Sequence, residues 1–269
     1  MIALPMSFLR NWLNRRTLQR HVLDPQQWEA LCASLPLLHG LDAGERQRLG
    51  ELAVLFLHGK RIDALQGLQL DEADRLHLAA QACLPLLALP AADWYQGFRQ
   101  ILLYPADFIS PQQWIDEDGL EHCGEEIRSG EAWQHGPVIL SWPEVEASGG
   151  LDGFNLPIHE LAHKLDMLTG SANGQPPLHA DMRPAEWTQV MQAAYDWLCH
   201  EVDQHPQREP PLDAYATESP AEFFAVCSEY FFSAPDLLHD CFPQVYAQLR
   251  LFYRQDPLAR LLPWLSAES

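Results

Sequence analysis

The stretch His-Glu-Leu-Ala-His at residues 159–163 decides how this sequence is interpreted. In an α-helix of about 3.6 residues per turn, side chains four positions apart lie above one another on one face. The imidazoles of His159 and His163 can therefore converge on one cation, with Glu160 beside the first of them. This is the H-E-x-x-H pattern, in which two histidines bind zinc and the glutamate takes a proton from the attacking water. Zinc is the favoured ion because imidazole and carboxylate ligands suit it.

A motif this short can arise by chance in a chain with 12 histidines, so the assignment needs a third ligand. The longer metzincin pattern would require a glycine at position 166 and a histidine at position 169. The chain has Asp166 and Thr169 there, which excludes that class.

A glutamate on a second helix is the alternative third ligand. Ser219 and Pro220 begin such a helix, with serine as the N-cap and proline at the first helical position. We predict that Glu222 completes the site and that each chain binds one zinc ion. The spacing of Ser219 and Glu222 also fits a capping box, in which the glutamate only hydrogen-bonds the backbone. The residues alone leave both interpretations open.

Two further acidic residues near these helices have uncertain roles. Asp166 shares a helix face with both histidines, so it either accepts a proton from a ligating imidazole or is a solvated or helix-end acid. Glu229 lies two turns beyond Glu222 on the same face. Carboxylates on helix surfaces are usually solvated, and Glu229 is therefore left outside the predicted site.

Charge and composition exclude other classes of function. The 17 basic and 37 acidic residues give a formal net charge of −20, which repels nucleic acid. No apolar run is long enough to span a bilayer, and the N-terminal arginines follow the apolar stretch, unlike those of a secretory signal. Six scattered cysteines without a C-x-x-C pair indicate free thiols in a reducing cytoplasm. The chain also lacks a G-x-S-x-G elbow, a P-loop and a G-x-G-x-x-G loop.

Hydrophobic periodicity predicts an α+β fold that is mainly helical with a small sheet. Helices are expected from residue 42, at about 71–84, from near 157, and at about 185–204, 220–233 and 244–254. Short β-rich runs follow residue 98, at 101–104, 114–115 and 137–142.

This order of elements predicts an N-terminal helical portion, 1–97, and a catalytic portion, 98–269, in one compact unit. The run 137–142 is either an edge strand along which a peptide adds or a purely structural strand. A basic amphipathic helix at 8–20 either packs on the acidic body or docks on a partner.

Three stretches in combination resemble the Mlc titration factor A (MtfA) family. They read H-E-L-A-H-K-L-D at 159–166, A-E-F-F-A at 221–225, and A-A-Q-A-C-L-P-L-L at 79–87 followed by W-Y-x-G-F at 94–98. The resemblance covers nearly the whole chain. It implies a cytoplasmic zinc peptidase with aminopeptidase-like activity and a zincin-like catalytic domain similar to that of anthrax lethal factor.

The resemblance also implies roles for individual residues. The two histidines and the distal glutamate bind zinc, the motif glutamate is the base, and a tyrosine seven residues before the glutamate ligand stabilises the transition state. These positions match His159, His163, Glu222, Glu160 and Tyr215. From the residues alone, Tyr215 is either an oxyanion donor or a packed aromatic side chain.

A partner is implied as well: the glucose-responsive transcriptional repressor Mlc, which proteins of this family sequester and which stimulates the peptidase. The expected function is thus a zinc metallopeptidase of the gluzincin type, with H-E-x-x-H plus glutamate. The alternative is a non-catalytic protein that sequesters a regulator and keeps zinc as a structural clamp.

Overall fold

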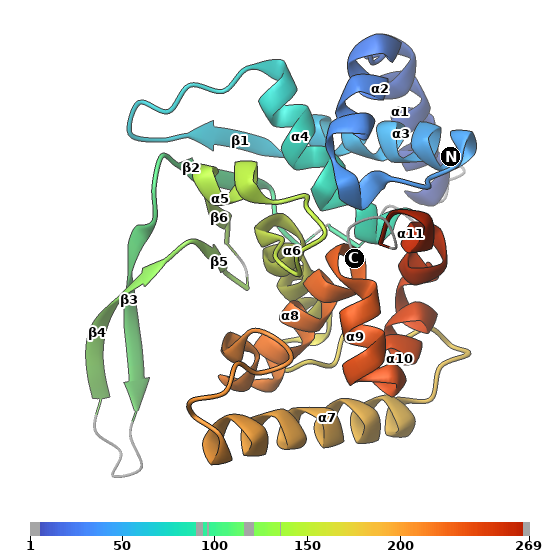
Figure 1. Ribbon diagram of the computed structural model, residues 1–269. Coiled ribbons are helices and arrows are strands. Elements are labelled where there is room, and N and C mark those ends of the chain that lie inside the picture. The colour runs from blue at the N-terminus through green and yellow to red at the C-terminus, as the bar shows by residue number, and fades with distance from the viewer. Residues whose placement is uncertain (1–5, 90–93, 96, 116–120, 135, 266–269) are drawn as a thin grey trace.

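The computed structural model describes residues 6–89, 94–95, 97–115, 121–134 and 136–265, and it is mainly helical with a small sheet (Figure 1). This confirms the α+β class. The helices are α1 (Met6–Arg20), α2 (Pro25–Ser34), α3 (Ala43–Gly59), α4 (Glu72–Cys83), α5 (Trp142–Ala147), α6 (Leu156–Asp166), α7 (Pro184–Gln204), α8 (Pro220–Ser233), α9 (Pro235–Cys241), α10 (Pro243–Tyr253) and α11 (Pro257–Leu265). Short 3₁₀ turns form η1 (Pro36–Leu38), η2 (Leu84–Leu86), η3 (Met167–Thr169) and η4 (Ala214–Thr217). The strands are β1 (Arg61–Ala64), β2 (Gln100–Tyr104), β3 (Phe108–Ile115), β4 (Glu121–Arg128), β5 (Gly130–Ala132) and β6 (Val138–Ser141).

Local capping explains where many of these helices begin. At α3, the Asp42 side chain accepts the N–H of Glu45, whose carboxylate accepts the N–H of Asp42 in return. The same reciprocal pair forms between Asp71 and Asp74 at α4. Such caps satisfy donors that the first turn of a helix leaves unpaired. The helix start predicted at residue 42 is therefore confirmed.

The four-stranded sheet has the order β1-β2-β6-β5, and β5 alone runs antiparallel to its neighbour. All four residues of β6 are buried, because β6 lies between β2 and β5. Of the two interpretations of the run 137–142, the edge strand is therefore wrong and the structural strand is confirmed. The end strand on this side of the sheet is β5, which has only three residues and begins with a glycine, too weak a pattern to predict. Strands β3 and β4 form a separate hairpin that extends away from the helices (Figure 1).

The core is built around α6 and α8, which pack against each other in the middle of the molecule (Figure 1). All eleven residues of α6 are buried, its polar ones included. Burying polar side chains is costly unless they find partners, so this helix is the place to look for a functional site.

One hydrophobic cluster continues from Trp28 to Tyr253 and so includes both of the expected portions. In addition, β1 of the N-terminal portion pairs with β2. From the other end of the chain, Arg260 of α11 donates a hydrogen bond of 2.8 Å to the Leu37 carbonyl of η1. The boundary after residue 97 stays a prediction.

Surface and thiol features complete the fold. Helix α1 packs on α3, while its Trp12 and Leu13 remain about half exposed. None of the described helices is both long and apolar enough to cross a membrane. The cysteines with described side chains are all free thiols: Cys32, Cys83, Cys199, Cys227 and Cys241. The side chain of Cys123 lies outside the described residues.

Candidate metal centre

Three donor atoms converge where α6 meets the start of α8. His159 Nε2 lies 3.0 Å from Glu222 Oε2, and His163 Nε2 lies 3.1 Å from the same oxygen. The two Nε2 atoms are 3.2 Å apart. Within the described part of the chain, these residues form the one cluster of His, Cys, Asp or Glu that could hold a metal ion.

The spacing of these atoms fits a tetrahedral zinc site. Donors about 2.1 Å from a tetrahedral ion lie about 3.4 Å from one another, close to the separations seen between the histidines and Glu222. Two imidazole nitrogens and one carboxylate oxygen are also a donor set that zinc favours.

Ser219 forms half of the predicted capping box. Its hydroxyl accepts the N–H of Glu222 at 3.2 Å, so serine is the N-cap of α8. The Glu222 carboxylate faces the two histidines, and no hydrogen bond from the Ser219 N–H to it is formed among the described residues. The geometry therefore favours Glu222 as a ligand over Glu222 as a cap.

The electrostatics of the cluster favour a cation. Burial alone would lower the pKa of His159, but the carboxylates of Glu229 and Glu222 raise it well above its usual value. Burial would likewise raise the pKa of Glu222, yet hydrogen bonds to His159 and His163 hold it well below its usual range. A place that stabilises extra protons in this way also stabilises a divalent ion.

Glu160 lies beside the cluster with its carboxylate in the wall of a cavity of about 330 Å³. It is 4% exposed, and its Oε2 atom has no hydrogen-bond partner among the described residues. Burial raises the pKa of this carboxyl group. Its Oε1 atom packs on Gly130 of β5, where an added Cβ would lie only 2.3 Å away. No pattern in the sequence indicates this role of Gly130.

Tyr215 lines the same cavity from η4, which directly precedes α8. Its ring centre is 5.9 Å from that of His159. Burial raises the pKa of the phenol, which therefore keeps its proton at neutral pH. The structure thus brings together all five residues of the predicted site: His159, Glu160, His163, Tyr215 and Glu222.

Glu229 belongs to this arrangement, contrary to the expectation that it is solvated. It is buried, and its Oε1 atom lies 2.7 Å from Nδ1 of His159. Its Oε2 atom accepts the N–H of Asn155 at 2.6 Å, and the Asn155 side chain donates to Gln81 of α4. A carboxylate that accepts the second N–H of a ligating histidine fixes the orientation of the ring. The signal that could have found it is the spacing of seven residues from Glu222 on one helix face.

Asp166 is a helix-end acid, because it is the last residue of α6, but it is not solvated. It is fully buried, and its carboxylate accepts the backbone N–H groups of Asn173, Gly174 and Gln175 at 2.6–2.9 Å. The C-terminal end of α6 is thereby tied to the loop that leads to α7.

Comparison with known proteins identifies the family of this site. Residues 9–254 match the profile of the glucose-regulated metallo-peptidase M90 family. The chain belongs to the M90 family. The site therefore lies in a metallopeptidase fold, which agrees with a donor cluster suited to a metal.

Relatives within the M90 family match over most of their length. Proteins named Mlc titration factor A from Yersinia pestis (strain Pestoides F) and Yersinia pseudotuberculosis serotype O:1b (strain IP 31758) are each 46% identical over 240 residues. These matches cover 88% of this chain and 87% of each relative. A protein of the same name from Yersinia pestis bv. Antiqua (strain Antiqua) matches equally well.

The Glu229 contact leads to a testable expectation for this M90 protein. In Glu229→Gln the amide retains a single acceptor oxygen for two donors, the Asn155 N–H and the His159 Nδ1–H. If the amide group donates to Nδ1 instead, the proton moves to Nε2 and blocks metal binding. We expect zinc affinity, measured by chelator competition, to fall about 10- to 100-fold.

A control for this variant is Glu186→Gln on α7, the same chemical change at another carboxylate that accepts a side-chain hydrogen bond. Both variants are checked for folding by circular dichroism. Wild-type zinc affinity in a folded Glu229→Gln protein would show that Glu229 only fills space.

Proposed function

We propose that this protein is a zinc-dependent peptidase with a zincin-like active site. One zinc ion is held by His159, His163 and Glu222. The convergence of their three donor atoms within 3.0–3.2 Å of one another is the observation that carries the proposal. When bound, zinc polarises the scissile carbonyl and lowers the pKa of water to about 7.

Glu160 acts as the general base and then as the general acid. Its carboxylate is free to accept the proton of the attacking water, because Oε2 has no hydrogen-bond partner among the described residues and borders the cavity. Burial raises its pKa above the usual value, which suits a group that must take up a proton and return it to the leaving amine.

Tyr215 donates a hydrogen bond to the oxygen that becomes negatively charged in the transition state. Its phenol remains protonated and lies in the cavity beside His159. A donor placed where charge develops lowers the barrier of the reaction more than it strengthens binding of the substrate.

A peptide substrate fits along β5, one of the two end strands of the sheet. Its residue Gly130 contacts Glu160 and, with Ser129, borders the cavity, so an extended peptide paired with β5 would pass the base. The cavity of about 330 Å³ accommodates a short part of a peptide. The proposal includes aminopeptidase-like activity because the resemblance to the MtfA family implies it.

The names of the relatives support a regulatory partner as well. The Yersinia proteins are called Mlc titration factor A. We therefore propose that a transcriptional repressor similar to Mlc is the partner of this chain. The free thiols support a cytoplasmic location. A non-catalytic role, in which the protein only sequesters the repressor, is the second candidate function, and the relatives' name favours it.

Metal analysis together with activity tests these proposals. We expect one zinc per chain and cleavage of alanyl chromogenic substrates that stops with chelator and returns with added zinc. His159→Ala and His163→Ala should lose nearly all zinc, since each removes one of three protein ligands. Zinc binding without any cleavage would support the sequestering role, and full zinc occupancy in either variant would place the metal elsewhere.

A further inference from the structure

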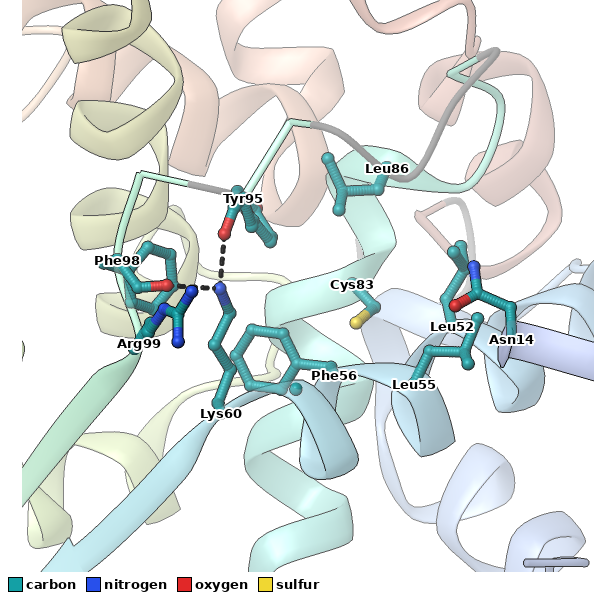
Figure 2. A pocket seen from close by; sticks show the side chains of 11 residues that line it. Asn14, Leu52, Leu55, Phe56, Lys60, Cys83, Leu86, Tyr95, Phe98 and Arg99 are labelled. Carbon is teal, nitrogen blue, oxygen red and sulfur yellow. Dashed lines mark hydrogen bonds between the residues drawn. The ribbon is translucent and has the colours of Figure 1, made fainter. Parts of the chain in front are cut away.

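A second cavity, of about 350 Å³, lies between α3, η2 and the segment that leads into β2 (Figure 2). It shares no lining residue with the cavity at the metal centre. Its volume lies in the range of small-molecule sites, which starts at about 300 Å³. The proposed peptidase reaction does not use this cavity.

The cavity is charged at one end and mainly apolar at the other. Figure 2 shows Lys60 and Arg99 together at one end, while Leu52 and Leu55 of α3 lie at the opposite end beside the amide of Asn14 from α1. Phe56, Cys83 and Leu86 are among the residues that line the space, so most of the wall is apolar. A ligand that fits this surface has one charged end and a hydrocarbon or aromatic body.

The charged end of the cavity lacks a counter-ion. Lys60 Nζ donates to the Phe98 carbonyl at 2.7 Å and to the Tyr95 carbonyl, which leaves the third of its N–H donors for a ligand. Neither Lys60 nor Arg99 forms an ion pair with a carboxylate of the described residues. Burial above all, followed by the charges of Lys164 and Arg99, lowers the pKa of Lys60 to about 8. An anion bound here would relieve this repulsion.

A third polar group at this wall also lacks a partner. Tyr95 is 5% exposed, and its hydroxyl has no hydrogen-bond partner among the described residues. Its ring stands nearly edge-on to Phe56, with 6.1 Å between the ring centres. Buried hydroxyls are normally hydrogen-bonded, so the Tyr95 hydroxyl retains a donor and an acceptor for a ligand or a water.

We propose that this cavity binds a small amphipathic carboxylate, such as a medium-chain fatty acid. The carboxylate contacts Lys60 and Arg99, and the hydrocarbon chain extends along Leu52 and Leu55. A monoanion fits better than a phosphate ester, because only two cations are present and the rest of the wall is largely apolar.

The site is connected to the metal-binding helix through a single aromatic ring. Lys60 Nζ lies 3.9 Å from the centre of the Phe98 ring, and Lys164 Nζ lies 5.2 Å from it. Lys164 follows His163 in α6 and donates to the carbonyls of Trp133 and Gly136, in the turn between β5 and β6. A ligand bound at Lys60 therefore lies close to the contacts of Lys164 that hold α6 against the turn between β5 and β6. It does not touch the proposed metal ligands.

Calorimetric titration of the full chain with decanoate tests the proposal, with decanol as the uncharged probe of the same length. We expect one decanoate per chain and at least tenfold weaker binding of decanol. Arg99→Gln should weaken decanoate binding about tenfold, which corresponds to about 1.4 kcal/mol. Arg183→Gln, the same change at another exposed arginine, should bind decanoate as the wild type does.

Leu55→Trp fills the apolar end of the cavity and should abolish decanoate binding in a protein that circular dichroism shows to be folded. If this variant does not fold, the comparison of Arg99→Gln with Arg183→Gln decides, because both residues are exposed. Equal affinity for decanoate and decanol, or no saturable binding at about 1 mM, would overturn the proposal. The titration is repeated with and without zinc. Because it measures decanoate binding and not cleavage, its result is independent of whether the proposed peptidase function holds.

Discussion

Glu160→Gln is expected to remove peptidase activity by roughly 10²-fold or more while zinc stays bound. The amide cannot take a proton from water, and general acid–base catalysis contributes about this much to a rate. Glutamine has nearly the same size as glutamate, so it fits beside Gly130, whose missing side chain leaves room for this carboxylate. The measurements are kcat on an alanyl substrate and zinc content per chain.

Glu146→Gln on α5 is a suitable control for this variant, since it makes the same chemical change at an exposed position. It should retain wild-type activity and zinc. If Glu160→Gln instead loses zinc and Glu222→Gln keeps it, the two glutamates have exchanged roles and the mechanism proposed for Glu160 is wrong.

Glu222→Gln is expected to weaken zinc binding by at least the 10- to 100-fold that is typical of losses around a metal ligand, and to remove activity. The amide can still hydrogen-bond, but it lacks the negative charge that faces both histidines. Zinc affinity is measured by chelator competition on the metal-free protein.

Glu72→Gln is the control for Glu222→Gln. It separates the loss of a metal ligand from the loss of a negative charge that stabilises the start of a helix. Glu72 lies in the first turn of α4 as Glu222 does in the first turn of α8, so both changes remove a favourable first-turn charge. Only Glu222→Gln should lose zinc. Wild-type zinc affinity in Glu222→Gln would mean that Glu222 is only a cap, and the third ligand would then be sought at Glu218.

The parts of the site that the sequence predicts depend on local signals. A spacing of four residues places His159 and His163 on one helix face, and the Ser219-Pro220 pair marks the start of α8. Both signals act within one or two turns of helix, so they do not require knowledge of the rest of the fold. The helices at 185–204 and 220–233 follow from periodicity in the same way.

The parts that could not be predicted depend on packing between distant segments. Glu229 contacts His159 only because α8 crosses α6, and 70 residues separate the two side chains in the chain. Asp166 is held by a loop whose course the helical pattern does not specify. Strand β5 has too few residues to show alternation, and its pairing with β6 shows only in three dimensions.

Gly130 of β5 contacts the carboxylate of Glu160, the proposed base, and this contact limits how the sequence can change. Because a Cβ at position 130 would lie 2.3 Å from Glu160 Oε1 and 2.7 Å from Leu156 Cδ1, a substitution there must displace these side-chain ends or be matched by a smaller residue at 160. A smaller residue at 160 would no longer be a base placed at the metal. Mutational drift at these two positions is therefore coupled, and a glycine upstream becomes a search criterion for the H-E-x-x-H motif. The pair can distinguish a working motif of this type from one that arose by chance.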